Sequence, residues 1–118
     1  MASSHLDNEF VESLLEQLAL IGNVRARAMF GGHGIYHADT MFAIVVDDIF
    51  YLKADNVTRP QFIARGLNPF SYVARGKTVT MQYYEAPPEL FEDEEAMLHW
   101  ARQAIEVSLR AKKEKRKS

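Results

Sequence analysis

The residues best suited to chemistry gather in the segment RAMFGGHGIYHAD, where His33, His37 and Asp39 follow a run of glycines. Imidazole and carboxylate groups are common metal ligands. On an extended strand, however, His33 and His37 would point to the same side about 13 Å apart, too far to share one ion unless a β-bulge intervenes. We therefore expect no metal and no cofactor. A small metal-dependent enzyme using these three residues is the least favoured function.

The glycines Gly31, Gly32 and Gly34 follow a strand-like run, as glycines do in phosphate-binding loops. Their spacing is not G-x-G-x-x-G, and the residues after them favour a strand rather than a helix. No helix N-terminus would then face a bound phosphate. We interpret these glycines as structural residues at a sharp bend in the sheet.

Other catalytic patterns are weak. Asp47 and Asp48 are adjacent carboxylates, but they lie at the tip of a predicted hairpin, where nothing would separate their pKa values. The sequence contains no G-x-S-x-G, H-E-x-x-H or P-loop motif. It has no cysteine, which removes disulfides, thiolate metal sites and cysteine nucleophiles. The sequence predicts a protein that is not an enzyme.

Positive charge is unevenly distributed along the 118 residues. The net charge is −2, but the last nine residues, RAKKEKRKS, hold six basic side chains against one glutamate, which leaves −7 for the rest. The candidate nucleic-acid contacts are Arg25, Arg27, Arg110, Lys112, Lys113, Lys115, Arg116 and Lys117. Because the body is acidic, such contacts should concentrate on the tail or on a local patch of arginine and lysine. We favour arginines paired with local carboxylates and tyrosines at the edge of the core over a nucleic-acid face.

The periodicity of apolar residues predicts the elements that carry these groups. We expect a helix over 7–21, a strand from 24, a short extended piece at 35–36, strands at 41–46 and 49–53, a helix over 56–66, a hairpin over 70–85 and a long helix from 91. This order predicts an α+β fold on an antiparallel sheet. We expect one domain over 1–109 and a basic C-terminal tail over 110–118.

The ends and inward faces of the helices can also be predicted. Ser4 and Asp7 would form a capping box, and Asn56 would cap the second helix. Phe62 and Ile63 would anchor that helix, and Gly66 would end it. The last helix should bury a stripe made of Met97, Ala101, Ala104, Ile105 and Leu109.

The hairpin MFAIVVDDIFYLK is apolar on both faces. A two-residue turn at Asp47 and Asp48 would pair Val46 with Ile49. One face would then hold Met41, Ala43, Val45, Phe50 and Leu52. The other would hold Phe42, Ile44, Val46, Ile49 and Tyr51. If all three helices pack on one side, the second set, or else the first, would face water, so we predict a homodimer that buries the exposed set. The candidate interface residues are those of the second set. A monomer with helices on both faces is the alternative.

Several short motifs follow one another in a specific order: Met29-Phe30-Gly31-Gly32, Tyr51-Leu52-Lys53, Pro69-Phe70, Tyr83-Tyr84-Glu85 with Pro87, and Trp100-Ala101. From Val24 to Ala104 the chain resembles the N-terminal domain of the TfoX/Sxy family, regulators of bacterial competence genes. The resemblance implies an α-β(3)-α-β(2)-α order, similar to secretion-chaperone-like folds. It also implies a non-enzymatic role as a coactivator beside the cyclic-AMP receptor protein, and it supplies no catalytic residues.

Full-length members of that family carry a helical C-terminal domain, whereas this chain ends in the basic tail and so resembles the stand-alone form. The sequence shows neither a secretory signal nor an apolar run long enough to span a membrane. We therefore expect a cytoplasmic bacterial binding or adaptor module that contacts a partner protein through its sheet. Direct nucleic-acid binding through the tail is the main alternative.

Overall fold

The computed structural model of the chain describes residues 2–29 and 31–117, with the side chains of residues 9–29 and 31–115. Its helices are α1 (Ala2–Gln17), α2 (Arg59–Ala64) and α3 (Glu94–Lys117), with 3-10 turns η1 (Ala19–Ile21) and η2 (Pro88–Glu92). Its strands are β1 (Val24–Met29), β2 (Gly32–His37), β3 (Thr40–Val46), β4 (Ile49–Lys53), β5 (Pro69–Ala74) and β6 (Lys77–Glu85).

The strands form one antiparallel sheet in the order β1-β2-β3-β4-β6-β5. This confirms the predicted α+β class and the order of helix, strands, helix, two strands, helix. Four strands precede α2 where the family resemblance implies three, since the chain reverses near Gly31 and β2 starts at Gly32. The predicted bend is confirmed at Gly31, which has a φ of 77°, whereas Gly32 and Gly34 lie within β2 and do not have the predicted positive φ.

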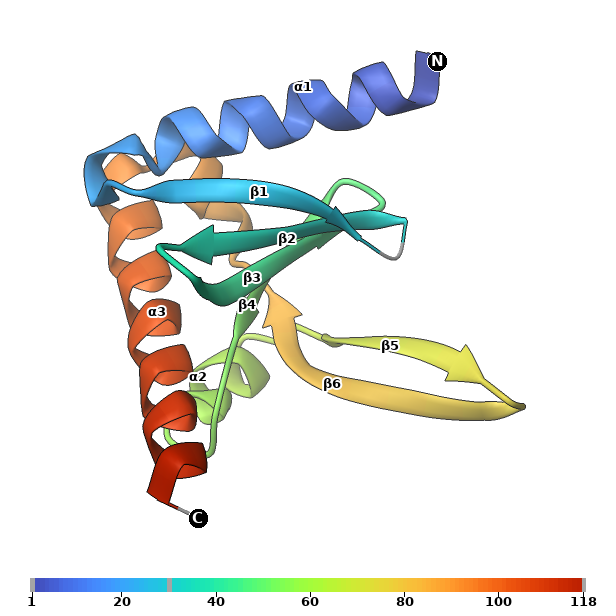
Figure 1. Cartoon of the computed structure of the whole chain (residues 1–118), viewed down its shortest axis with the longest axis vertical. Coiled ribbons are helices and arrows are strands. Elements are labelled where there is room, and N and C mark those ends of the chain that lie inside the picture. The colour runs from blue at the N-terminus through green and yellow to red at the C-terminus, as the bar shows by residue number, and fades with distance from the viewer. Residues whose placement is uncertain (1, 30, 118) are drawn as a thin grey trace.

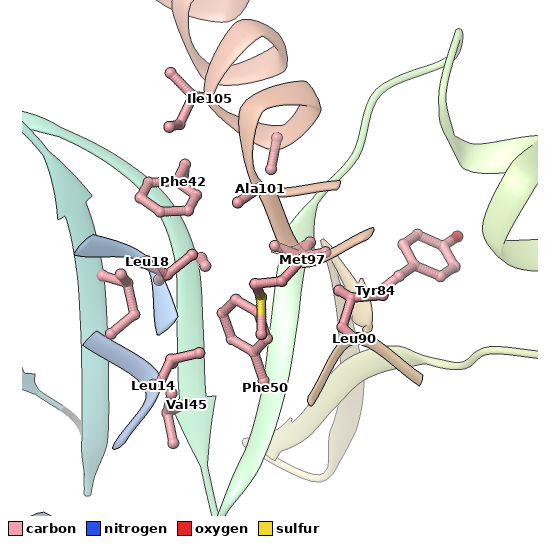
Figure 2. Close-up of a cluster of buried hydrophobic side chains, with 14 of the residues drawn as sticks. Leu14, Leu18, Phe42, Val45, Phe50, Tyr84, Leu90, Met97, Ala101 and Ile105 are labelled. Carbon is pink, nitrogen blue, oxygen red and sulfur yellow. The ribbon is translucent and has the colours of Figure 1, made fainter. Parts of the chain in front are cut away.

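The helices share one face of the sheet. α3 packs on β3 and β4, and α1 lies along β1 (Figure 1). Phe62 of α2 is buried in the same layer, with its ring 5.4 Å from that of Tyr84 and 5.2 Å from that of Trp100. Between helices and sheet lies the main core, where Leu14 and Leu18 meet the inward side chains of the strands (Figure 2). The opposite face of the sheet carries no helix over the residues described.

The central hairpin has the predicted register, with Val46 opposite Ile49 and Ala43 opposite Leu52. The predicted faces were wrong for two residues, Phe42 and Met41. Between β2 and β3 the register shifts from Ile35–Ala43 to Tyr36–Met41, so Phe42 is an extra residue in β3, a β-bulge. The bulge turns Phe42 into the main core, where it is fully buried (Figure 2). It leaves Met41 on the side of the sheet opposite the helices.

The predicted N-terminal caps of α1 and α2 can be compared with the structure for α2 only. The side chains of Ser4 and Asp7 lie outside the described residues. α2 is capped at Thr58 and not at Asn56, because the Asp55 carboxylate accepts the backbone N–H groups of Val57 and Thr58 and holds the chain in a turn there. Gly66 follows the helix with a φ of 72°, as predicted.

Two residues predicted to face the core, Ile63 and Leu109, are exposed instead. Ile63 is exposed on α2, so Phe62 alone anchors that helix. On α3 the buried stripe ends in Val107 and Ser108, and Leu109 is exposed. Four residues turn a helix 40° beyond a full turn, so the spacing from Met97 through Ala101 and Ile105 rotates away from the sheet by Leu109.

Candidate binding face of the sheet

We call the sheet surface opposite α1 and α3 the helix-free face. Its buried centre consists of Ile44, Tyr51 and Tyr83, with Met41, Val46, Phe70 and Met81 packed around them. The ring of Phe70 lies 5.3 Å from that of Tyr51, which ties β5 to β4 across β6. The strongly curved β6 carries the β5–β6 hairpin away from α3 (Figure 1).

Most of the residues predicted to form a dimer interface on the central hairpin are covered by other parts of the same chain. Ile44 and Tyr51 are 7% and 8% exposed, so the chain itself covers them. Val46 is half-buried, and Ile49 is 40% exposed. With Phe42 in the core, the apolar patch left to water is much smaller than the sequence suggests. The homodimer stays a prediction, but it needs a different contact surface.

Cations on the helix-free face lie over tyrosine rings. Val24 and Ala26 of β1 pack on the main core, so Arg25 and Arg27 lie on the other side. Their guanidinium carbons are 5.4 and 5.9 Å from the centre of the Tyr36 ring. These are cation–π distances. Arg25 and Arg27 therefore contact an aromatic ring, where the sequence predicted pairing with carboxylates.

A second cation makes the same kind of contact. The Lys53 ammonium lies 5.4 Å from the ring of Tyr83, its register partner on β6. Burial raises the pKa of Tyr83 to about 12, and the nearby Tyr36 adds to the effect. Tyr83 is therefore neutral at physiological pH, and its ring packs in the buried centre of this face.

A hollow of about 260 Å³ opens where β3 begins and β4 ends, against the last turns of α3. Three lysines line it, Lys53, Lys112 and Lys115, together with Asp39 and Thr40. Burial lowers the pKa of Lys53, and repulsion from Lys115 lowers it further. The Lys112 ammonium donates to Asp39 at 3.3 Å. Positive charge is thus concentrated in one place on an otherwise acidic body.

The predicted tail is the C-terminal end of α3, which is helical through Lys117. Arg110 donates to Asp55 at 2.8 Å, so two of the candidate nucleic-acid residues, Arg110 and Lys112, are held by carboxylates of the body. Lys113 is exposed on the helix surface. The side chains of Arg116 and Lys117 lie outside the described residues.

The histidine segment has a simple structural arrangement. His33 lies opposite Val45 and His37 opposite Thr40, near the two ends of β2. Asp39 contacts Lys112, whose hydrogen bond lowers the pKa of that carboxyl group. Within residues 2–29 and 31–117, no three histidine or acidic side chains come together as metal ligands.

Sequence reasoning missed Asp55, which connects three segments. Its carboxylate accepts N–H groups of Val57 and Thr58 on one oxygen and the Arg110 guanidinium on the other, while its own N–H donates to Thr58 Oγ1. The local signal was present, because Asp followed three residues later by Thr is typical of a side-chain-stabilised turn. The contact with Arg110, 55 residues away, had no such signal.

The comparisons with known proteins agree with this architecture. The family model of the TfoX N-terminal domain matches residues 16–108. The chain is 31% identical to DNA transformation protein TfoX1 of Aliivibrio fischeri over 116 residues, covering 98% of this chain and 53% of that protein. It is 26% identical to protein Sxy of Escherichia coli over 97 residues, covering 82% of this chain and 46% of that protein.

A third relative, DNA transformation protein TfoX of Haemophilus influenzae, is 39% identical over 82 residues, which cover 68% of this chain and 36% of that protein. The chain thus spans about half or less of the length of these curated relatives. Among the described residues, none of the helices is both long and apolar enough to cross a membrane.

Proposed function

Because this chain belongs to the TfoX N-terminal domain family, we propose that it is a non-enzymatic regulatory module in bacterial DNA transformation. Two of the relatives described above are named DNA transformation proteins, which supports this role. The family match includes every strand of the sheet, so the proposal concerns the folded body rather than a short motif.

The observation that carries the proposal is the helix-free face with its cations over tyrosines. Arg25 and Arg27 lie outermost there, because they cover the ring of Tyr36. Arginine and tyrosine, with tryptophan, are enriched among the residues that contribute most of the binding energy at protein interfaces. Since the rings are covered and the cations are exposed, we propose that the partner presents an acidic protein surface to this face. The cyclic-AMP receptor protein, which the resemblance names, is the first candidate partner.

A chimera tests this proposal. The segment of A. fischeri TfoX1 that matches this chain is replaced by residues 1–118, and transformation frequency is measured in a strain that lacks the native gene. We expect the chimera to restore transformation and Arg27→Glu to abolish the effect. Arg102→Glu, which makes the same charge change on the exposed surface of α3, is the matched control and should leave transformation unchanged.

Two outcomes contradict the proposal. If the folded chimera gives no transformation, the regulatory role does not extend to this chain. If Arg27→Glu and Arg102→Glu behave alike, the helix-free face is not the contact surface. Circular dichroism of each purified chain shows whether it is folded.

The lysine hollow favours a second function, contact with nucleic-acid phosphates. Lys53, Lys112 and Lys115 gather there, and each neutralised phosphate steepens the salt dependence of binding. Lys112→Gln with Lys115→Gln should weaken gel-shift affinity for duplex DNA and flatten its decline with salt. The paired control is Arg25→Gln with Arg27→Gln. If the two double variants lose the same affinity for duplex DNA, the hollow is not a specific phosphate-binding site.

A further inference from the structure

The two edges of the sheet are protected differently. β1 forms one edge and carries Arg25 and Arg27, charges of the kind that keep an edge strand from pairing with another chain. β5 forms the other edge, and its sequence PFSYVA contains no charged residue. Tyr72 and Val73 on this strand are 45% and 72% exposed. The β5 edge is therefore open to pairing.

The hairpin that carries this edge receives little support from the body. Its base is anchored where Phe70 packs on Tyr51, but the outer part of the β5–β6 hairpin projects from the molecule (Figure 1). Residues 71–73, 75–78 and 80 are all exposed. A two-stranded ribbon is at best marginally stable in water without a third strand or a packed layer. A further strand along β5 would stabilise it.

The backbone of β5 offers pairing groups at two positions. Arg75 and Gly76 form a two-residue turn with φ values of 55° and 77°, so Ala74 and Lys77 flank the turn as a hydrogen-bonded pair. Bonded and non-bonded pairs alternate along an antiparallel ladder, so Tyr72 again bonds to Val79. The N–H and C=O groups of Ser71 and Val73 consequently point away from β6, toward the open edge.

We infer that β5 pairs in antiparallel orientation with β5 of a second copy of this chain, about a two-fold axis at Tyr72. The outward groups then match, since Ser71 of each copy meets Val73 of the other and Tyr72 meets its own equivalent. A surface that is complementary to itself about a two-fold axis forms a closed dimer. One sheet then continues through both copies.

Charge complementarity favours a second copy as the occupant. The tip of the hairpin carries Arg75 and Lys77, and the sequence has no acidic residue between Asp55 and Glu85. Glu85 lies at the base of the hairpin, where its carboxylate accepts the N–H of Asn68. Antiparallel pairing about Tyr72 places the tip of each hairpin, with Arg75, toward the base of the other, which carries Glu85. The interface also leaves the buried Ile44 and Tyr51 undisturbed.

Engineered cysteines test the pairing directly, because the chain has none of its own. At the two-fold axis, the two copies of residue 72 form a non-bonded pair with Cα atoms about 4.5 Å apart, within the range that a disulfide bridges. Tyr72→Cys should give a disulfide-linked dimer under mild oxidation. Val79→Cys is the matched control on the same face, one strand further in, where the two copies would be about 14 Å apart and should not link.

Light scattering during gel filtration gives an independent result. We expect the unaltered chain to have twice the monomer mass of 13.5 kDa at micromolar concentration. Val73→Pro removes only an outward N–H group, so it should give a monomer whose circular dichroism is unchanged. Val73→Thr keeps that group and should remain a dimer.

The inference is overturned by a mass of 13.5 kDa across a tenfold dilution series of the unaltered chain. It is also overturned if Tyr72→Cys and Val79→Cys link equally well, or if Val73→Pro stays dimeric while Ile49→Asp becomes monomeric. That last result would place the interface on the central hairpin. If Val73→Pro unfolds, the cysteine pair still decides the question.

Discussion

Arg110 donates two hydrogen bonds to Asp55 Oδ2, from Nε at 3.2 Å and from Nη2 at 2.8 Å. Asp55 precedes α2 and Arg110 lies near the end of α3, so this contact joins the C-terminal part of the longest helix to the loop between β4 and α2. The same carboxylate accepts N–H groups of Val57 and Thr58 on its other oxygen. One side chain thus stabilises both a local turn and a distant helix.

Asp55→Ala should lower the free energy of unfolding by about 1–2 kcal/mol, because it leaves the turn before α2 without its acceptor. Asp39→Ala is the matched control, since Asp39 also pairs with a cation of α3 but its side chain is 80% exposed. That exposed pair should contribute little. Urea denaturation measures both, and equal losses would refute the special role of Asp55.

The contribution of Asp55 should also depend on pH. Partial burial alone would raise its pKa, but hydrogen bonds from Arg110 and from the Thr58 and Val57 backbone outweigh burial and lower the pKa. The stabilisation is therefore present above the unfolded-state pKa of about 3.9 and is lost as the pH falls through the folded-state pKa. The stability difference between the unaltered chain and Asp55→Ala should shrink between pH 6 and pH 2. A constant difference over that range would contradict this assignment.

The bulge in β3 predicts unequal effects for two neighbouring residues. Phe42→Ala should cost about 3–4 kcal/mol of unfolding free energy, because Phe42 is fully buried in the main core. Met41→Ala should cost less than about 1.5 kcal/mol, since Met41 is half-buried on the helix-free face. Thermal or chemical denaturation of the two variants distinguishes the bulged register from a regular strand, in which Met41 would be the costlier loss.

Gly32 and Gly34 should differ in their tolerance of a side chain. A Cβ atom at Gly32 would clash with the backbone carbonyl oxygen of Val45. At Gly34 it would meet Met41 Sδ at 2.7 Å and Met29 Cε at 3.0 Å, both on flexible side chains that can move. We expect Gly32→Ala to destabilise by about 2 kcal/mol or more, in line with other overpacked sites, and Gly34→Ala by less than about 1 kcal/mol. Melting temperatures of the two variants provide the comparison, and the reverse order would exclude this explanation.

Substitutions in the hairpin turn at Asp47 and Asp48 should stabilise the protein. Both residues have positive φ, 53° and 61°, as in a type I′ turn, for which Asn-Gly is the favoured pair. Asp47→Asn combined with Asp48→Gly should raise the unfolding free energy by about 0.5–1 kcal/mol. The double alanine variant removes the same two charges without the turn preference. If it stabilises the chain equally, charge rather than backbone conformation is the cause.

Local patterns predicted most of the fold. The alternation around Asp47 and Asp48 determined the register of Val46 and Ile49, and Gly66 marked the end of α2. These features depend on neighbours within a few residues. The bulge at Phe42 depends instead on how β2 pairs with β3, a choice between registers that the apolar pattern of β3 alone does not make.

The candidate site was less predictable for the same reason. Arg25 and Arg27 were recognised as cations on one side of a strand, but their contact with Tyr36 arises from the pairing of β1 with β2. The contact of Lys53 with Tyr83 likewise arises from the pairing of β4 with β6, which are not consecutive strands. Periodicity assigns a residue to a face, whereas the contacts on that face follow from the three-dimensional path of the chain.

Each pair of neighbouring strands in the sheet is also consecutive along the chain, except β4 and β6. The two hairpin systems, β1 to β4 and β5 with β6, can therefore form early from local contacts, with small losses of loop entropy. Joining them requires closure of the segment that contains α2, where Leu52 meets Tyr84. We expect docking of β6 on β4 to be the slow step of folding, so a mutation at this junction should slow refolding more than one in the β3–β4 turn or the β5–β6 turn.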